Sequence, residues 1–449
     1  MSEVHRIRRG LDIKLTGEPE KKVTAISTDK FALKPPDFMG VFPKTFVKEG
    51  DLVKAGTPVF FHKYRDNIIF TSPVSGKVTE IHRGAKRKML EIRIDSDGKM
   101  EYESFGKGDP KSMSREQILE KLLKSGVWAY FRQRPYSIIA DPENTPKAIF
   151  ISAFDSAPLA PDYDFIVEND VQAFQIGLDA LTMLTSGKVH LNVREGQTKS
   201  RAFLEARGVQ INRFAGPHPV GNVGVQIHHV DPINKGDIIW YLNPQAVIII
   251  GKLFREGIYD ASRIISVCGS EIKNPQYFKV ITGTSILPLV KDNTNSANVR
   301  YISGNVLTGT KIDKVGYLGF YDQQLTVIPE GDYHEFLGWA MPRFNKFSYS
   351  KTFFSWLNPS KKYALDTNMN GAHRAFVLTG QYEKVLPMDI YPMQLLKAIM
   401  VKDIDLMEQL GIYEVDEEDF ALCEFVDASK TEMQSIVREG LDLMLKEMS

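Results

Sequence analysis

Two matched stretches decide the fold of the N-terminal part of the chain: Val47-Lys48-Glu49-Gly50-Asp51-Leu52-Val53-Lys54-Ala55-Gly56 and Ser72-Pro73-Val74-Ser75-Gly76-Lys77-Val78. Each sets short alternating strands beside a turn, the first of the Gly-Asp type and the second of the Pro-x-x-Gly type. Such tight turns need positive φ, which glycine adopts without steric cost. The pair predicts two interlocked β-hairpins within a β domain over residues 1–104.

These turns resemble the biotinyl/lipoyl fold. Carrier domains of that fold present a lysine at a hairpin tip, eight residues before the turn proline, and a cofactor is attached to it. In this chain the equivalent position is Arg65, whose guanidinium cannot be acylated. The resemblance therefore implies a barrel-sandwich β module that serves as structure, and the chemistry must lie elsewhere.

The composition is that of an ordinary globular protein. A length of 449 residues suffices for about two to four domains. Hydrophobic residues make up 43% and charged residues 25%, which excludes a disordered chain. Lys+Arg and Asp+Glu both number 56, so overall charge draws the protein neither to nucleic acid nor to an anionic membrane.

Cysteines and apolar runs limit the remaining classes. Cys268 and Cys423 lie far apart and outside any Cys-x-x-Cys unit, which argues against zinc ribbons, iron–sulfur clusters and a disulfide framework. Residues 1–6 include basic side chains without an apolar run behind them, which argues against a signal peptide. No stretch approaches the roughly 18–20 apolar residues of a membrane helix. We expect a cytoplasmic protein that reaches any membrane through a partner.

Residues 105–260 alternate strand and helix patterns, which predicts a Rossmann-like α/β domain with a parallel sheet. The expected elements are a helix that starts at the capping box of Ser114 and Gln117, a buried strand at 147–152, a helix at 171–184, and strands at 189–193 and 246–251. The dinucleotide fingerprint is missing, because Ser152-Ala153-Phe154-Asp155-Ser156-Ala157-Pro158 has no glycine that lets backbone approach a pyrophosphate. A flavin- or NAD-dependent reductase acting alone is therefore disfavoured.

The last two domains are predicted from glycine-rich short strands and from helical periodicity. Residues 261–380 predict a small mixed α+β domain, and residues 381–449 a helical domain. Between two of its helices, Asp416-Glu417-Glu418-Asp419 is expected to be a solvated linker and helix start.

The histidines do not predict a metal site. His218 and His228 are too far apart for a pair on one helix, and His228 and His229 would point to opposite faces of a strand. The chain also has no Gly-x-Ser-x-Gly elbow, His-Glu-x-x-His pair or Walker lysine. We assign no metal and no catalytic side chain.

One segment differs from the other motifs because it combines aromatic and basic side chains. Residues 127–136 carry four aromatic side chains and two arginines just after a helix stop, on the edge of a rigid scaffold. Rings stack on a planar ligand, and arginine donates to oxygens that gain negative charge on reduction, so a quinone fits this set. In the alternative, Trp128 and Phe131 are core, and the arginines pair with Asp141 and Glu143. A second, proline-stiffened loop at 33–40 presents Phe38 and Met39, which could wall an apolar pocket or simply pack domains together.

Taken together and in order, these motifs resemble the NqrA family, one of the subunit families of the sodium-translocating NADH:quinone oxidoreductases (Nqr complexes). The resemblance runs over essentially the whole chain, and it rests on Lys34-Pro35-Pro36-Asp37-Phe38, the turns at Gly50-Asp51 and Pro73-x-x-Gly76, 128–136, 148–162, Gly216-Pro217-His218-Pro219, Ile227-His228 and Ser303-Gly304. The family is related to RnfC of the Rnf electron-transport complex and to the flavin-binding subunit of respiratory complex I. Those relatives carry a glycine-rich flavin and NADH loop and cysteine clusters, and this chain has neither.

The resemblance implies a peripheral subunit on the cytoplasmic side of the bacterial inner membrane, docked chiefly on NqrB, the membrane flavoprotein of the complex. NADH oxidation, the flavins and the Na⁺ path are expected on other subunits, so this chain would bind no cofactor of its own. The resemblance also implies that residues 261–380 form a small ubiquitin-like ligand-binding domain of the SLBB type, and that the protein takes part in binding ubiquinone or menaquinone.

Two hypotheses follow. In the first, the chain helps to form a quinone site, with Phe131, Arg132, Arg134, Pro135 and Tyr136 as its residues and Phe38 and Met39 as weaker wall candidates. Arginine would stabilise charge on the reduced quinone and not carry protons, because its pKa is too high for acid–base work. In the second, the chain is a docking and assembly subunit with no ligand of its own, and the aromatic segment is an interface hot spot.

Overall fold

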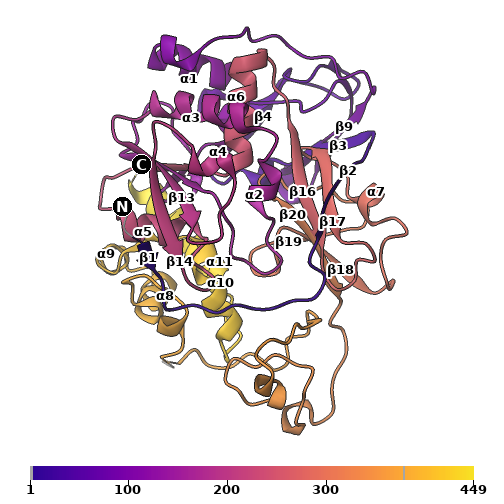
Figure 1. The fold of residues 1–449 in the computed structure, drawn as a ribbon, viewed down its shortest axis with the longest axis vertical. Helices are drawn as coiled ribbons and strands as arrows, with labels where there is room; N and C mark the ends of the chain where they lie inside the picture. Colours follow the sequence, from indigo (N-terminus) through magenta and orange to yellow (C-terminus); the bar gives the residue numbers. More distant parts are fainter. Residues whose placement is uncertain (1–3, 378–379, 449) are drawn as a thin grey trace.

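The computed structural model describes residues 4–377 and 380–448. Within them the strands form four sheets, and helices gather on the α/β sheet and at the C-terminal end of the chain (Figure 1). Of the segment considered for a signal peptide, residues 1–3 lie outside the described part. The expected multidomain α/β architecture is present, with a β module, an α/β domain, a mixed α+β domain in the place expected for the SLBB domain, and a helical region.

The β module is built from two small sheets that share one core. Their orders are β3-β9-β8-β5 and β4-β6-β7. The strands are β3 (Lys30–Leu33), β4 (Pro43–Thr45), β5 (Leu52–Val53), β6 (Pro58–His62), β7 (Arg65–Thr71), β8 (Gly76–Arg83) and β9 (Met89–Ser96). Gly50 of the first turn and Gly76 of the second have φ of 99° and 156°, in the range that favours glycine. Arg65 begins β7 and forms an ion pair of 2.9 Å with Asp141, so the position of the carrier lysine ties this module to the α/β domain.

Two strands within the expected span of 1–104 pair with the sheets of later domains. β1 (Val4–Arg6) pairs in parallel with β14 (Gln210–Ala215) of the α/β sheet, and β2 (Glu20–Ala25) pairs in parallel with β17 (Gln276–Ile281) of the SLBB sheet. Each covers an edge whose backbone groups would otherwise lack partners. The N-terminal segment thus fastens two later domains to each other.

The α/β domain is a seven-stranded sheet of order β1-β14-β13-β12-β15-β10-β11, parallel except at β10 and β11. Its strands are β10 (Arg132–Arg134), β11 (Ile138–Ile139), β12 (Ala148–Ser152), β13 (Lys188–Arg194) and β15 (Ile239–Leu242). Its helices are α1 (Arg115–Lys124), α2 (Tyr163–Ile166), α3 (Val171–Thr182), α4 (Arg201–Leu204), α5 (Val223–Val230) and α6 (Pro244–Glu256). The capping box at Ser114 and the predicted elements at 147–152, 171–184 and 189–193 are confirmed.

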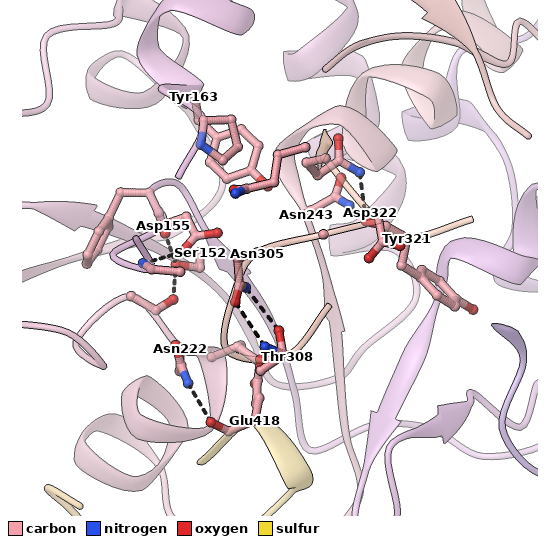
Figure 2. Close-up of a pocket in the computed structure, with 18 of the residues that line it drawn as sticks. Ser152, Asp155, Tyr163, Asn222, Asn243, Asn305, Thr308, Tyr321, Asp322 and Glu418 are labelled. Atoms are coloured by element: carbon pink, nitrogen blue, oxygen red, sulfur yellow. Dashed lines mark hydrogen bonds between the residues drawn. The ribbon is translucent and has the colours of Figure 1, made fainter. Parts of the chain in front are cut away.

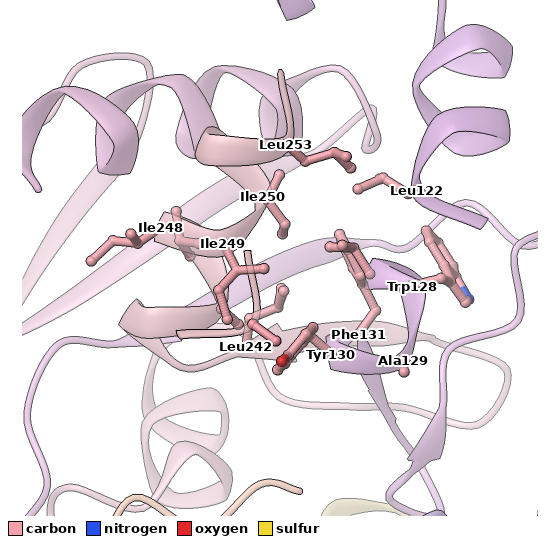
Figure 3. Packing of buried hydrophobic residues seen from close by; sticks show 14 of the residues in the cluster. Leu122, Trp128, Ala129, Tyr130, Phe131, Leu242, Ile248, Ile249, Ile250 and Leu253 are labelled. Atoms are coloured by element: carbon pink, nitrogen blue, oxygen red, sulfur yellow. The ribbon is translucent and has the colours of Figure 1, made fainter. Parts of the chain in front are cut away.

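The strand predicted at 246–251 is wrong, because these residues lie within α6. The Asn243 side chain caps this helix by accepting from the Ala246 amide at 2.8 Å, and Gly257 ends it with φ of 77°. The helix is apolar nearly all round because it is buried between the sheet and its neighbours, so its sequence looks like a core strand. Figure 3 shows Ile249 and Ile250 beside Phe131.

The rest of the chain forms a mixed sheet and a helical region. The six-stranded SLBB sheet has the order β19-β18-β20-β16-β17-β2. Its remaining elements are β16 (Ser262–Cys268), α7 (Leu287–Val290), β18 (Val299–Ser303), β19 (Thr310–Ile312) and β20 (Gln324–Pro329), and the C-terminal helices are α8 (Pro392–Met400), α9 (Ile404–Gln409), α10 (Glu417–Val426) and α11 (Met433–Met448). After β20, residues 333–377 form a loop-rich lobe at one end of the molecule (Figure 1).

Candidate functional site

The two rings of the aromatic segment are core. Trp128 and Phe131 are fully buried and stack with ring centroids 4.6 Å apart. The Trp128 indole donates to the Ala140 carbonyl at 2.8 Å, and Trp240 meets it edge-on at 5.1 Å. Figure 3 shows both Trp128 and Phe131 within the apolar layer beside α6. The packing alternative is therefore right for these two side chains.

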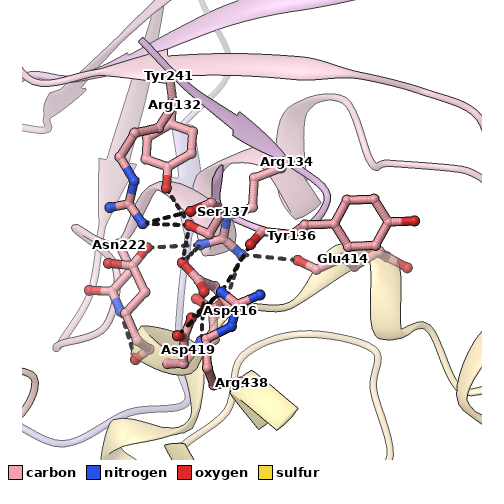
Figure 4. Close-up of polar contacts among 12 residues, drawn as sticks. Arg132, Arg134, Tyr136, Ser137, Asn222, Tyr241, Glu414, Asp416, Asp419 and Arg438 are labelled. Atoms are coloured by element: carbon pink, nitrogen blue, oxygen red, sulfur yellow. Dashed lines mark hydrogen bonds and ion pairs between the residues drawn. The ribbon is translucent and has the colours of Figure 1, made fainter. Parts of the chain in front are cut away.

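Arg134 is also buried, but its partners are not the expected Asp141 and Glu143. Its guanidinium donates to Asp419 Oδ2 and to Glu418 Oε1, both at 2.9 Å, and lies 3.4 Å from Asp416 Oδ2. These carboxylates belong to the start of α10, so Arg134 holds the C-terminal helices against the α/β sheet (Figure 4). The residue that binds Asp141 is Arg65 of the β module.

The acidic run is a helix start, as predicted, but not a solvated linker. Asp416 caps α10 in a capping box with Asp419, and both are buried. Burial alone would raise the pKa of Asp416, but Arg134 holds that pKa well below its ordinary value. Burial raises the pKa of Glu418 to about 7 against the opposing pull of Arg134. Two carboxyl groups of the run thus have pKa values shifted in opposite directions, that of the buried Asp416 downward and that of the partly exposed Glu418 upward.

Glu417 supplies a test of this arrangement. Burial, and then the neighbouring Asp416, raise its pKa from 4.5 to about 8, although Arg438 opposes the shift. Because the pKa is higher in the folded than in the unfolded state, the stability from this group is complete below about pH 4.5 and is lost as pH rises through about 8. We expect Glu417→Gln, which cannot ionise, to raise the melting temperature at pH 8 by about 2–4 °C and to change it little at pH 5. Thermal unfolding at both pH values measures this, with the exposed Glu120→Gln as control. An equal shift at both pH values would contradict it.

Arg132 lies on the same strand as Arg134 but contacts different groups. Its guanidinium lies between the rings of Tyr241 and Tyr321, 5.2 and 5.1 Å from their centroids. It donates to the Ser137 hydroxyl at 2.7 Å, and that hydroxyl donates to Asp416 at 2.5 Å. Arg132 is thus positioned by two rings and by the same acidic cluster that holds Arg134 (Figure 4).

The other candidates occupy different surroundings. Pro135 is buried, and the half-buried Tyr136 turns its ring edge-on to Tyr413 at 6.2 Å. Phe38 is core, 4.4 Å from Phe70 and 5.9 Å from Tyr321 between ring centroids. Met39 is exposed.

A cavity of about 220 Å³ opens where β12 and β15 end, against loops of the SLBB domain (Figure 2). In the α/β sheet β13 lies on one side of β12 and β15 on the other, so the cavity lies at the topological switch point, where open α/β sheets bind ligands. Arg132 is the one quinone candidate among the lining residues. The lining also includes Ser152, Asp155, Tyr163, His218, Asn222, Tyr241, Asn243, Asn305, Thr308, Tyr321, Asp322 and Glu418.

Several of these lining groups are buried and titratable. Burial raises the pKa of Asp155, although the Ala157 amide donates to its carboxylate at 2.8 Å. Burial lowers the pKa of His218 to about 4, so its ring is neutral at pH 7. The Ser156 hydroxyl lies 3.0 Å from His218 Nδ1 and accepts from the Gly221 amide. The motif residues around 152–158 and 216–219 therefore meet at this cavity, which their spacing in the sequence did not reveal.

His228 and His229, which lie outside the cavity, have structural partners. His228 and His229 lie on α5 and not on a strand. His228 Nδ1 is 2.8 Å from Glu414, and its Nε2 accepts from the Asp389 amide at 3.1 Å. In the part of the chain that the structure describes, no three His, Cys, Asp or Glu side chains gather as a metal ion requires.

Comparison with known proteins agrees with this architecture. Three family models match: the "NqrA N-terminal barrel-sandwich hybrid domain" over residues 5–97, the "NqrA second alpha/beta domain" over 113–259 and the "NQRA C-terminal domain" over 264–314. The NqrA subunit of the Na⁺-translocating NADH-quinone reductase of Rhodopirellula baltica is 40% identical, over 99% of this chain and 98% of its own. The corresponding subunit of Pasteurella multocida is 38% identical over 98% and 99%, and that of Tolumonas auensis 40% over 97% and 98%.

The fold, the domain order and these relatives define a subunit of an NADH-quinone reductase. More closely, the chain belongs to the NqrA family of the Na⁺-translocating NADH-quinone reductases, as its motifs indicated. Among residues 4–377 and 380–448, no helix has the length and apolarity to cross a membrane.

Proposed function

We propose that this protein binds the headgroup of ubiquinone or menaquinone in the cavity at the ends of β12 and β15. The observation that carries the proposal is the Arg132 guanidinium on the cavity wall, held between Tyr241 and Tyr321. A guanidinium donates to carbonyl oxygens and stabilises the negative charge that they gain on reduction. The rings of Tyr241 and Tyr321 hold this guanidinium in place at the wall.

The size of the cavity limits which part of the quinone it holds. At about 220 Å³ it is smaller than the roughly 300–1,000 Å³ of pockets that enclose drug-sized ligands. It therefore suits the ring, and a prenyl tail would run outside it.

A carboxyl group on the wall extends the proposal to proton supply. Burial raises the pKa of Glu418 to about 7. A carboxyl group with a pKa near the working pH both holds and releases a proton, which quinone oxygens need on reduction. Arg132 would orient the ring, and Glu418 would protonate it.

The place of the chain in the complex is part of the same proposal. Electrons would reach the cavity from NADH through flavins on other subunits, and Na⁺ would cross the membrane elsewhere in the complex. The chain would dock on NqrB at the cytoplasmic side of the inner membrane. Its membership of the NqrA family supports this arrangement.

A second candidate is a docking and assembly role with no ligand. It is favoured by the burial of Phe131, Arg134 and Phe38, which pack domains together and present nothing to a ligand.

Arg132→Met in the assembled complex separates the two roles. We expect quinone reduction to fall about 10- to 100-fold, since one charge-assisted hydrogen bond contributes roughly 1.5–3 kcal/mol. NADH oxidation with an artificial acceptor that takes electrons upstream should stay at the wild-type rate. Arg213→Met, which removes a half-exposed arginine paired with Glu195, is the matched control. Wild-type quinone reduction by Arg132→Met would reject the quinone site, and loss of the complex itself would favour the assembly role.

A further inference from the structure

The lobe, residues 333–377 between β20 and α8, exposes an unusual number of large apolar side chains. It is built from loops and the short turns η5 (Gly338–Ala340) and η6 (Phe354–Leu357), and it projects at one end of the molecule (Figure 1). Phe336 is 91% exposed. The others that are about half exposed or more include Met341, Phe344, Phe354, Trp356 and Leu357. We call these six side chains the apolar tip. Apolar groups gathered in this way mark a surface that is covered in the working protein.

Contacts within the lobe bring together the part of the apolar tip that lies in residues 341–357. The rings of Phe344 and Phe354 lie 5.9 Å apart between centroids, and the Phe354 amide donates to the Pro342 carbonyl at 2.8 Å. Phe354, Trp356 and Leu357 share the single turn η6. This part of the tip is therefore built by packing the loop at 341–344 against η6.

The same lobe is basic although the whole chain is neutral. Residues 333–377 hold two acidic side chains, Glu335 and Asp366, against the six basic ones Arg343, Lys346, Lys351, Lys361, Lys362 and Arg374. Glu335 is neutralised by Arg343 at 2.7 Å and by Lys346 at 2.8 Å. The Lys361 ammonium donates to the Phe344 carbonyl, so a cation lies within the tip itself.

We propose that the apolar tip rests on the surface of an anionic lipid bilayer. Aromatic and lysine side chains together favour the boundary between lipid headgroups and acyl chains. A local excess of positive charge attracts a protein to anionic lipid. A protein partner more typically binds in a groove, on a helix face or along a strand edge. In the lobe the apolar groups protrude from loops and short turns, and a fluid surface conforms to such a shape. The chain, whose described residues include no spanning helix, would in this way touch the membrane directly beside its partners.

Sedimentation of the purified full chain with vesicles tests the proposal. We expect binding to vesicles of phosphatidylcholine and phosphatidylglycerol to be at least about 10-fold tighter than to phosphatidylcholine alone, and to weaken with salt. Phe336→Ser with Phe344→Ser should reduce binding to the anionic vesicles about 10-fold or more. Lys351→Glu with Lys361→Glu should remove the preference for anionic lipid.

The matched control is Leu52→Ser, because Leu52 is a similarly exposed apolar residue of the β module. It should leave vesicle binding unchanged, and equal melting temperatures of all variants show that the fold is intact. The proposal is overturned if the wild-type chain ignores both kinds of vesicle, or if the double phenylalanine variant binds as the wild type does. It is also overturned if that variant fails only to join the complex, which would make the tip a protein interface.

Discussion

Replacing Arg134 with alanine is expected to lower the free energy of unfolding by about 3–5 kcal/mol. The guanidinium is completely buried, and it pairs with Asp416, Glu418 and Asp419 at the start of α10. Its removal leaves the buried Asp416 and Asp419 without their cation, which costs far more than the pairs contribute when intact. Urea unfolding of the purified chain at pH 7 measures the loss.

The control for Arg134→Ala is Arg65→Ala. Arg65 also bridges two domains through one carboxylate, Asp141, but it is partly exposed, so its loss should cost less than about 1 kcal/mol. Arg134→Lys should recover only part of the stability, because an ammonium cannot donate in two directions to carboxylates on both sides. Equal losses for Arg65→Ala and Arg134→Ala would show that burial does not set the strength of the Arg134 pairs.

The structural role of Arg134 limits how Arg132 and Arg134 can be tested for a part in quinone binding. A variant that replaces both Arg132 and Arg134 would lose quinone turnover simply because the C-terminal helices separate from the sheet. Of the two, Arg132 lines the cavity, and the fully buried Arg134 does not. Activity assays therefore need Arg132 changed by itself.

The sequence correctly predicted those turns and helix ends that depend only on neighbouring residues. The glycine turns of the β module and the capping box of Ser114 are set by residues within a few positions of one another. The strand wrongly predicted at 246–251 also had a local signal: Asn243-Pro244 is an N-cap followed by proline at the first helical position, and Gly257 is a C-terminal stop. The run of β-branched residues between them outweighed those caps.

The parts that could not be predicted depend on contacts between distant segments. The carboxylates of 416–419 look like a solvated run until Arg134, far earlier in the chain, is placed against them. The cavity draws residues from the ends of β12 and β15, from the loop at 218–223 and from SLBB turns near 304 and 321. No spacing along the sequence reports which of these segments the sheet topology brings together. The residue types of the aromatic segment indicated a quinone site that includes Arg132. Only the structure shows that Arg132 reaches the cavity whereas Phe131 and Arg134 are buried.

Filling the cavity should have the largest effect on activity. Thr308 lies on the cavity wall at the end of a tight turn, where the Asn305 side chain accepts from the Thr308 amide at 3.0 Å (Figure 2). We expect Thr308→Trp to place an indole where the quinone ring would lie and to reduce quinone reduction about 100-fold, since even small displacements of a reactant cost that much. Thr308 is exposed, so the free energy of unfolding should change by no more than about 0.5 kcal/mol.

Thr310→Trp is the matched control, because Thr310 is an exposed threonine two positions further on, in β19 and outside the cavity lining. Both variants should reduce the artificial acceptor at the wild-type rate. If Thr308→Trp reduced quinone as fast as Thr310→Trp, the ring would not bind in this cavity.

The Thr308→Trp result also decides how a defect in Arg132→Met is interpreted, because Arg132 contacts the acidic cluster through Ser137 as well as the cavity. If both Thr308→Trp and Arg132→Met lower quinone reduction, the cavity itself is the quinone site. If only Arg132→Met lowers it, the defect comes from the weakened packing of α10.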